Sequence, residues 1–377
     1  MKAVALVDGE HYAPVVRDAL AALPYEWVGA ILVGGTEKLR EGGDYGVPLV
    51  DDFTGAEIVV DLSDEPVLGP AERFRWASRA LAAGLRYVGA DFRFDPPCFE
   101  PFEPPSIAVI GTGKRVGKTA VTAHLATLAA RDRDVVVVAM GRGGPPDPEV
   151  VEEPPTVADL VALSRAGRHS ASDHLEIAAL GGVPTIGCRR AGGGLAGAPF
   201  VSNVAAGAKL AAERSPELVI FDGSGAAIPP VAVDRRVLVV GPGAEPDAYL
   251  NTYRRLISDI VVSVGRDVPG AIRADLRLRA TEPLDGRIAV FTAGGIDVEH
   301  LDANVVHVSA NLADRAALRR ELSDLEADTY LVELKAAAID VVAEHALANG
   351  RRVVLAGNDV VAEGLDDALL SLLPERV

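Results

Sequence analysis

Gly111-Thr112-Gly113-Lys114-Arg115-Val116-Gly117-Lys118-Thr119 stands between a short apolar run and a stretch with helical spacing, and this order decides the fold. Residues 107–110 predict a buried strand, and residues 119–130 predict a helix. A glycine-rich turn between a strand and a helix lets backbone N–H groups point at phosphate oxygens. The stretch therefore predicts a phosphate-binding loop rather than an ordinary glycine-rich turn.

The residues of this loop have separable roles. Lys118 would reach the β and γ oxygens of a nucleoside triphosphate, and the Thr119 hydroxyl would bind Mg²⁺. The cofactors predicted are therefore ATP and Mg²⁺. The predicted nucleotide-binding residues are Gly111, Gly113, Val116, Gly117, Lys118, Thr119 and Ala120.

The first glycine of the loop lies one residue earlier than in the common form, at Gly111 instead of position 112. The resulting Gly-Thr-x-x-x-Val-Gly-Lys-Thr is similar to the loop of dethiobiotin synthetase and its relatives, which activate an acid with ATP and then close a ring. Partition-type ATPases carry a signature lysine five residues before the loop lysine. That position is Gly113 here, with Lys114 next to it, which disfavours a dimer-switch ATPase.

Short apolar runs alternate with helical patterns on both sides of the loop, which is typical of an α/β protein with parallel sheets. Residues 95–105 contain five prolines and predict a linker, because proline removes backbone donors. We expect a P-loop parallel-sheet core domain (101–285), preceded by a small α/β N-terminal domain (1–100). A C-terminal α/β section (286–377) follows, either separate or part of the core. In that last section, residues 336–348 predict a helix.

An acidic residue at the end of another strand should hold the metal ion. In Leu218-Val219-Ile220-Phe221-Asp222, four apolar residues precede Asp222, and a flexible turn follows. We interpret Asp222 as a metal ligand, or as a residue that orders a water ligand, rather than as a helix cap.

Three segments, each of which follows a strand or is rich in glycine, carry candidate anion-binding groups. Arg142 and Gly143 follow a strand, in Met140-Gly141-Arg142-Gly143-Gly144. Residues 188–197 place two adjacent arginines beside three glycines, which favours anion binding over a solvated loop. Glu10 and His11 follow the first strand. The predicted substrate-binding residues are Arg189, Arg190, Gly193, Gly194, Arg142, Gly143, Glu10 and His11.

For several other reactive side chains, a structural role remains an alternative to a functional one. Asp147 and Glu149 could help bind a metal, or could lie in an exposed acidic loop. The five-residue spacing of His169 and His174 disfavours a shared metal, and leaves phosphate contact or a capping role open. Cys188 is expected to be a buried small hydrophobic residue rather than a nucleophile.

The composition limits the classes of function. Of 377 residues, 49% are hydrophobic, and 37 Lys and Arg stand against 54 Asp and Glu, a net charge of −17. This charge disfavours binding of nucleic acid or an anionic membrane, so a local basic cluster must hold any anionic substrate. Two distant cysteines exclude a disulfide framework. Without a signal peptide or a membrane-spanning run, a cytoplasmic location is expected.

Taken together, these segments resemble the cyclic 2,3-diphosphoglycerate synthetase family, over most of the chain. The resemblance rests on residues 8–12, the loop 111–119, residues 141–144, residues 189–194 with 198–204, and residues 241–243. The Arg-Arg-Ala-Gly-Gly-Gly and Ala-Pro-Phe-Val-Ser-Asn segments are the family-like features, because the loop is specific only to the wider P-loop class.

The resemblance implies ATP-driven closure of 2,3-diphosphoglycerate to its intramolecular anhydride, with release of ADP and phosphate. The implied catalytic residues are Lys118, Lys114, Arg115 and Arg142, and Lys114 and Arg115 would stabilise charge on the transferring group. A homodimer is expected. Three rivals stay open: a 2-phosphoglycerate kinase, a carboxylate ligase of the dethiobiotin type and a nucleotide-dependent switch ATPase. A glutamine-dependent amidotransferase would need a cysteine in a nucleophile elbow, and neither cysteine lies in one.

Overall fold

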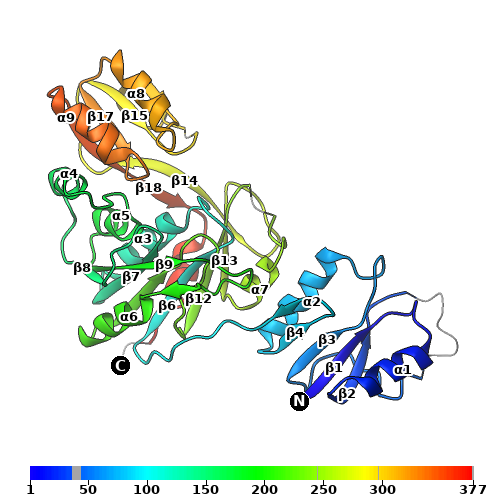
Figure 1. Ribbon diagram of the computed structural model, residues 1–377. Helices are drawn as coiled ribbons and strands as arrows, with labels where there is room; N and C mark the ends of the chain where they lie inside the picture. Colours follow the sequence, from blue (N-terminus) through cyan, green and yellow to red (C-terminus); the bar gives the residue numbers. More distant parts are fainter. Residues whose placement is uncertain (36–43, 244, 296, 376–377) are drawn as a thin grey trace. The chain divides into compact units, whose positions relative to one another are not determined.

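The computed structural model describes residues 1–35, 44–243, 245–295 and 297–375 (Figure 1). The chain forms two compact units, and each is treated by itself. The first unit comprises Met1–Cys98, Leu195–Gly197 and Glu245–Ser258. The second comprises Phe99–Gly194, Ala198–Ala244 and Asp259–Val377.

The first unit is built on a five-stranded sheet in the order β2-β1-β3-β4-β5, with the first four strands parallel. Its elements are β1 (Lys2–Val7), α1 (Ala13–Ala22), β2 (Glu26–Leu32), β3 (Ile58–Asp61), α2 (Pro70–Ala82), β4 (Arg86–Val88), β5 (Arg93–Phe94) and α7 (Asn251–Leu256). Five consecutive residues of β1 are buried, as expected for a central parallel strand.

The second unit contains a larger sheet, with 13 strands among the described residues. Its strands are β6 (Ser106–Gly111), β7 (Val135–Gly141), β8 (Glu149–Val151), β9 (Thr185–Ala191), β10 (Val201–Ser202), β11 (Leu218–Asp222), β12 (Arg235–Val240), β13 (Ile260–Val264), β14 (Ile272–Ala280), β15 (Arg287–Phe291), β16 (Asn304–Ser309), β17 (Thr329–Glu333) and β18 (Arg352–Val361). Its helices are α3 (Lys118–Ala129), α4 (Val157–Arg165), α5 (Asp173–Gly181), α6 (Val204–Glu213), α8 (Arg315–Ser323), the π-helix η1 (Ala338–Ala343), α9 (Glu344–Ala348) and α10 (Leu365–Leu370).

The larger sheet joins two parallel blocks through one antiparallel pair. Strands β9, β7, β11, β6, β12, β13 and β14 run parallel in that order. The second block, β18-β17-β15-β16, is also parallel, and β14 pairs with β18 in the antiparallel sense. The predicted α/β class, with a parallel P-loop core and a preceding α/β domain, is therefore confirmed.

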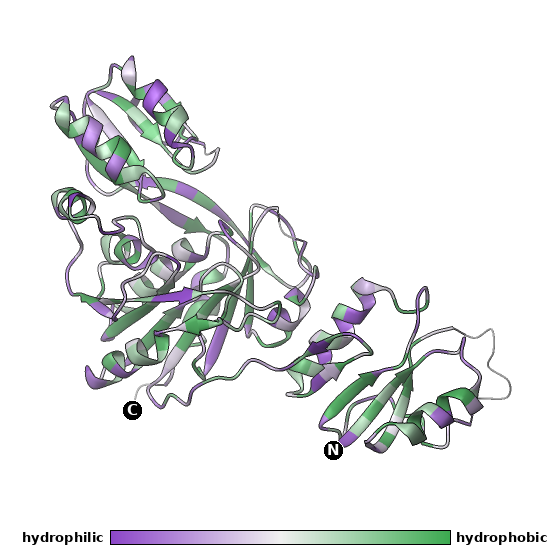
Figure 2. Cartoon of the chain, in the orientation of Figure 1, coloured by the Kyte–Doolittle hydropathy of each residue, from purple (hydrophilic) through white to green (hydrophobic). Residues whose placement is uncertain are grey.

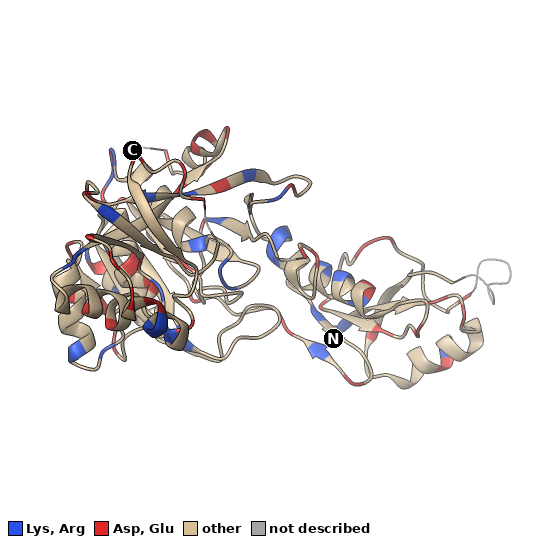
Figure 3. Ribbon diagram, turned by 90° about the horizontal axis from the view of Figure 1, so that it is seen from above, with Lys and Arg blue, Asp and Glu red and all other residues tan. Residues whose placement is uncertain are grey.

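The hydrophobic core of the P-loop region surrounds α3, which follows the loop. Val121, Leu125 and Leu128 of this helix pack with apolar residues of the neighbouring strands. The same cluster includes Val360 and Leu365, so the end of the chain helps to bury α3. Figure 2 shows the strands of both units mostly in the green of hydrophobic residues, and Figure 3 shows most charges on helices and loops.

Several elements differ from the sequence expectations. The predicted helix over residues 336–348 begins as a π-helix and continues as the short α9. Strand β14 alternates charged and apolar residues, so it lacks the continuous apolar run by which the other strands were found.

Residues 95–105 hold no helix or strand beyond a single bridge at Glu100, as expected of a proline-rich linker. No described helix has both the length and the apolar character that crossing a membrane requires.

Candidate active site

The glycine-rich loop leaves β6 and enters α3, as the sequence predicts. Gly117 adopts φ +93° just before α3, a backbone conformation that favours glycine, and Arg115 adopts φ +56°. Gly111 is needed for space, because a Cβ there would lie 2.9 Å from Val116 Cγ2 and 3.1 Å from Lys118 Cδ. The early first glycine therefore makes room for two side chains of the loop itself.

Lys118 is the first residue of α3 and is only 8% exposed. Its aliphatic stem packs beside Gly111, and its charge acts on the Asp222 carboxylate. Thr119 follows it on the first turn of α3 and is half-buried.

Asp222 ends β11 and is fully buried. Its Oδ1 accepts a hydrogen bond of 2.7 Å from Thr122 Oγ1, whereas its Oδ2 has no hydrogen-bond partner among the described residues. Burial raises the pKa of Asp222 to about 6, and the Lys118 charge opposes this shift. A buried carboxylate oxygen without a partner fits a cation or a water bound to one.

Three predicted cationic residues converge on the turn that follows β11. Gly225 adopts φ +60°, and a Cβ there would lie 3.3 Å from Arg142 Nη2, 3.4 Å from Arg190 Nη2 and 3.9 Å from Lys114 Cγ. The three side chains come from the loop, from the end of β7 and from β9. Burial and the Arg142 charge lower the pKa of Arg190. The turn thus gathers positive charge beside the phosphate-binding loop.

The two adjacent arginines have different surroundings. Arg190 Nη2 donates to Ser224 O (2.7 Å), Nη1 donates to Gly192 O (2.8 Å), and Nε is buried without a partner among the described residues. Arg189 has an exposed side chain, and its backbone N–H donates to Asn203 Oδ1 (2.7 Å). Both lie on β9, where successive side chains point to opposite faces. The sequence analysis treated both arginines as one anion-binding segment, but they lie at the end of β9, and it is the Arg190 guanidinium that reaches the Gly225 turn.

Close contacts exclude a side chain at two of the glycines near this cluster. A Cβ on Gly144 would lie 2.0 Å from Cys188 O, and one on Gly143 would lie 2.2 Å from the His169 ring. A Cβ on Gly193 would lie 3.2 Å from Arg190 Nη1, while Gly194 N–H donates to Ala198 O at 2.8 Å. Gly144 therefore lets the chain after β7 approach β9, which bears both arginines.

Glu10 and His11 lie in the first unit, after β1, on a turn ordered by Asp8. The buried Asp8 accepts hydrogen bonds from His11 Nδ1 (2.7 Å), from the backbone N–H groups of Glu10 (3.0 Å) and His11 (3.2 Å), and from Asp64 N–H (2.7 Å). Burial alone would raise the pKa of Asp8, but these hydrogen bonds hold it below its usual range. The sequence analysis included Asp8 in the segment 8–12 but not among the predicted site residues, although it directly follows the buried strand β1.

Other candidates are engaged elsewhere. Glu149, at the start of β8, forms an ion pair with Arg168. His174 is buried in the first turn of α5, where Ser172 Oγ lies 2.9 Å from its Nδ1, and burial lowers its pKa to about 4. Cys188 is fully buried, as predicted, and burial raises its pKa to about 12. Within the described ranges, no three His, Cys, Asp or Glu side chains form a metal-binding group.

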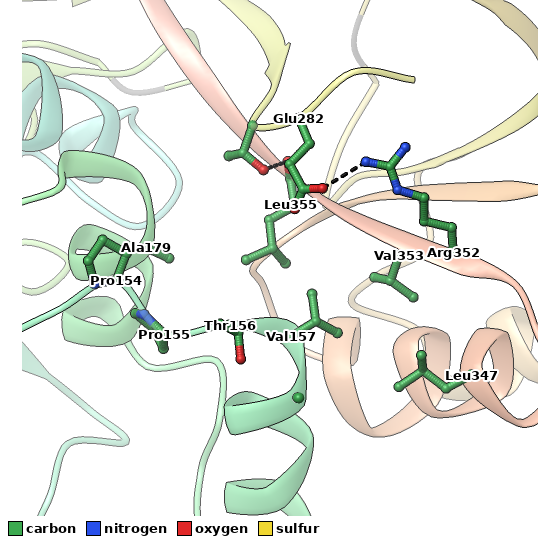
Figure 4. A pocket seen from close by; sticks show the side chains of 12 residues that line it. Pro154, Pro155, Thr156, Val157, Ala179, Glu282, Leu347, Arg352, Val353 and Leu355 are labelled. Carbon is green, nitrogen blue, oxygen red and sulfur yellow. Dashed lines mark hydrogen bonds and ion pairs between the residues drawn. The ribbon is translucent and has the colours of Figure 1, made fainter. Parts of the chain in front are cut away.

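A separate cavity of about 580 Å³ lies in the second unit away from the loop (Figure 4). Figure 4 shows Val353 and Leu355 of β18 facing Val157 of α4 across it. An ion pair of 2.7 Å between Arg352 and Glu282 lies on its rim. This cavity contains none of the predicted site residues.

Comparison with known proteins identifies similar sequences along the whole chain. Residues 106–273 match the family model for the cyclic 2,3-diphosphoglycerate synthetase P-loop domain, residues 296–359 that for the C-terminal domain, and residues 2–54 and 51–95 that for the N-terminal domain. A protein of Rubrobacter xylanophilus named cyclic 2,3-diphosphoglycerate synthetase is 48% identical, with 99% of this chain and 97% of the relative covered. Proteins of the same name from Pyrococcus abyssi and Methanothermus fervidus are 40% and 36% identical, covering 95% and 99% of this chain and 94% and 96% of the relatives. Among solved structures, LpxK from Aquifex aeolicus in complex with ATP aligns with TM-score 0.44 and 15% identity, over 74% of this chain and 91% of that one.

Proposed function

The chain belongs to the cyclic 2,3-diphosphoglycerate synthetase family, and we propose that it is an ATP- and Mg²⁺-dependent ligase that closes 2,3-diphosphoglycerate to its cyclic anhydride. The products besides the ring are ADP and inorganic phosphate. We expect the enzyme to act as a cytoplasmic homodimer on this small phosphorylated substrate. Light scattering of the purified protein tests the dimer.

The reaction divides into two phosphoryl transfers. First, an oxygen of one substrate phosphate attacks the γ-phosphorus of ATP, the bond to the β-phosphate oxygen breaks, and ADP leaves. Second, an oxygen of the other substrate phosphate attacks the inner phosphorus of the new anhydride, and that anhydride bond breaks to release inorganic phosphate. The ring now contains one phosphoanhydride bond. No enzyme nucleophile is required, so catalysis consists of positioning and charge stabilisation.

The residues of the loop and of the Gly225 turn suit these tasks. Lys118 would neutralise the β and γ oxygens of ATP, while the loop backbone would hold them. Lys114 and Arg115 would stabilise charge on the transferring group, and Arg142 and Arg190 would hold the substrate phosphates. Bidentate guanidinium contacts suit phosphate oxygens.

The side chains that would hold Mg²⁺ are Thr119 and Asp222, with phosphate and water oxygens completing the coordination. When bound, the ion would neutralise charge on the ATP phosphates. Asp222 supports this assignment, because its buried Oδ2 has no hydrogen-bond partner among the described residues. Thr122 fixes the carboxylate through the other oxygen.

The observation that carries the proposal is the convergence of Arg142, Arg190 and Lys114 around Gly225. A P-loop kinase or ATPase needs positive charge at the γ-phosphate, but a substrate with two phosphates and a carboxylate brings about five negative charges of its own. A second cationic group beside the loop is what such a substrate requires in a protein of net charge −17.

Phosphorus NMR of the protein with Mg-ATP and 2,3-diphosphoglycerate tests the function directly. We expect phosphoanhydride signals of a cyclic product to grow in step with ADP and inorganic phosphate. Lys118→Ala, with its fold checked by circular dichroism, should abolish them. The proposal is wrong if the wild-type protein consumes ATP without forming the cyclic product.

ATP labelled with ¹⁸O in its γ-phosphoryl group separates this ligase from a kinase. In the two-step reaction, the transferred group leaves as inorganic phosphate, so the label should appear there and not in the cyclic product. A kinase acting on 2-phosphoglycerate would instead retain the label in its phosphorylated product. Label found in the cyclic product would contradict the order of transfers given above.

A further inference from the structure

The side-chain amide of Asn203 joins β9 to the chain that follows β7. Its Oδ1 accepts a hydrogen bond from Arg189 N–H at 2.7 Å, on β9. Its Nδ2 donates to Pro146 O at 3.0 Å and to Pro145 O at 3.3 Å, in the chain after β7. One half-buried amide thus bridges two segments, and each segment carries one arginine of the cationic cluster.

The place of Asn203 in the fold would suit a different role, that of a helix cap. It stands at the N-cap of α6, where an asparagine side chain usually accepts a hydrogen bond from the backbone of the first turn. The Asn203 side chain makes no such bond to the first turn of α6, all of which the structure describes. The neighbouring Ser202 Oγ accepts from Val204 N–H instead, at 3.1 Å. Helix capping therefore does not account for this asparagine.

The chain after β7 has to be anchored by a donor from elsewhere. Pro145 and Pro146 have no backbone N–H, so this segment offers carbonyl oxygens and no donors of its own at these two positions. On the other side of the bridge, Arg189 offers an N–H. An amide carries an acceptor and donors at one planar end, so Asn203 can satisfy both sides, whereas a carboxylate has no N–H to donate.

The two bridged segments are in close backbone contact beside the amide. A Cβ on Gly144 would lie 2.0 Å from Cys188 O and 3.1 Å from Arg189 N, so the chain after β7 lies directly against β9. Glycine permits this approach but supplies no side chain to hold it. Asn203 adds directional hydrogen bonds to both sides of the same contact, and thereby fixes its spacing.

The same spacing separates Arg142 from Arg190. Arg142 lies two residues before Gly144, and Arg190 directly follows Arg189. Their Nη2 atoms lie 3.3 Å and 3.4 Å from the position of a Cβ on Gly225, so both guanidinium groups reach one turn. A shift of β9 against the chain after β7 would move one guanidinium group relative to the other.

Asn203 is itself held in place by the packing of α6. A Cβ on Gly207 of this helix would lie 2.3 Å from Cys188 Sγ on β9 and 3.4 Å from Val138 Cγ1 on β7. Gly207 N–H donates to Asn203 O, and Asn203 N–H donates to Arg189 O, both at 3.2 Å. The helix therefore rests on the two strands that lead into the bridged segments, and it presents the amide between them.

We propose that Asn203 is a positioning residue that sets the separation of Arg142 and Arg190, so that both arginines bind one phosphorylated substrate together. This inference rests on the proposed function of these two arginines. Without the amide bridge, the chain after β7 would no longer be tied to β9, and the two guanidinium groups would fit the same anion less well. The loss should appear in the binding of 2,3-diphosphoglycerate and not in that of ATP.

Calorimetric binding of 2,3-diphosphoglycerate and the KM values for both substrates test this inference. Asn203→Ser keeps a neutral side chain that can cap α6 but cannot bridge the two segments. We expect it to raise the Kd and the KM for 2,3-diphosphoglycerate about tenfold, with the KM for ATP within twofold of wild type. Asn203→Thr, a second neutral capping residue, should behave in the same way, and melting temperatures report that both variants are folded. Ser202→Ala is the matched control, since it removes the cap of α6 and should lower the melting temperature but change neither KM more than twofold.

A double-mutant cycle shows whether Asn203 acts through the arginines. In the Arg190→Ala background, the separation of the two guanidinium groups no longer matters, so adding Asn203→Ser should change the KM for 2,3-diphosphoglycerate less than twofold. A further rise of more than twofold in that background overturns the inference. So does a rise of less than threefold in the folded single variants, or an equal rise in the KM for ATP. Absence of cyclic product from the wild-type enzyme would instead overturn the proposed function.

Discussion

Arg190→Ala should raise the KM for 2,3-diphosphoglycerate strongly while leaving the KM for ATP nearly unchanged. The guanidinium has five N–H donors, of which two are engaged with Ser224 O and Gly192 O. Three remain for phosphate oxygens, including the buried Nε without a partner among the described residues. Charge-assisted hydrogen bonds contribute about 1.5–3 kcal/mol, so their loss corresponds to a rise of roughly 10- to 150-fold.

Arg189→Ala is the matched control, because it removes an identical charge one residue away. The Arg189 contact with Asn203 is made by its backbone N–H, which alanine retains, and its side chain is exposed. We expect a rise in KM below about threefold for this variant. Arg190→Lys should recover only part of the loss, because an ammonium group cannot form two parallel hydrogen bonds to one phosphate.

Steady-state ADP release at varied 2,3-diphosphoglycerate and saturating Mg-ATP, and the reverse, measures both constants. Melting temperatures report the expected loss of the two carbonyl contacts of Arg190, about 1 kcal/mol each. Equal effects of Arg189→Ala and Arg190→Ala would refute the reasoning that only one of these arginines faces the cluster. An equal rise in the KM for ATP would place Arg190 in the nucleotide site.

Three further changes test the site and its support. Asp222→Asn should raise the Mg²⁺ concentration for half-maximal activity sharply, because an amide carries no charge for the cation, and a titration identical to wild type would make Asp222 structural. Gly225→Ala should raise the KM for 2,3-diphosphoglycerate, because the added methyl group would contact Arg142 and Arg190. Gly182→Ala is the control, since Gly182 also has a positive φ (+63°) but no atom within 4 Å of an added Cβ. It should lower the free energy of unfolding by about 1–2 kcal/mol in denaturant titrations and leave KM unchanged. Burial holds the pKa of His174 near 4, below its value of about 6.5 in the unfolded chain. As the pH falls, the unfolded state therefore binds the proton first. The free energy of unfolding should decrease between pH 6.5 and 4 by up to about 3 kcal/mol. His174→Gln should flatten that part of the stability profile, and an unchanged slope would show that another group causes it.

The local pattern of the sequence predicts the parts of the fold that are continuous in sequence. The loop, its strand and its helix follow from residues 107–130, because glycine spacing and a buried apolar run are local signals. Strand β14 was missed, because Arg273, Asp275 and Arg277 alternate with apolar residues along its partly exposed face. The join of β14 with β18 depends on residues about 80 positions apart, and no local pattern records such pairing.

In the candidate site, too, local sequence predicts the residues but not their arrangement. Strand ends suggested Arg142 and Asp222, and three neighbouring glycines suggested Arg190, but only the strand order β9-β7-β11-β6 places their strands side by side. Strand alternation could have separated Arg189 from Arg190, had β9 been recognised as reaching Ala191. The ion pair of Lys335 with Glu176 lies outside any motif, because its partners come from the turn after β17 and from α5.

The hydrogen-bond partners of Arg190 explain how an acidic protein can keep positive charge for an anionic substrate. Many other arginines pair with carboxylates, as in Arg165 with Glu344 and Arg214 with Glu152. Arg190 instead donates hydrogen bonds to two backbone carbonyl oxygens, which fix its orientation without forming an ion pair. Burial lowers the pKa of Arg190, and repulsion from Arg142 lowers it further, so the folded protein holds this charge at a cost until an anion binds. Binding of a multiply charged phosphate would relieve this repulsion at short range, where it outweighs the unfavourable field of a net charge of −17.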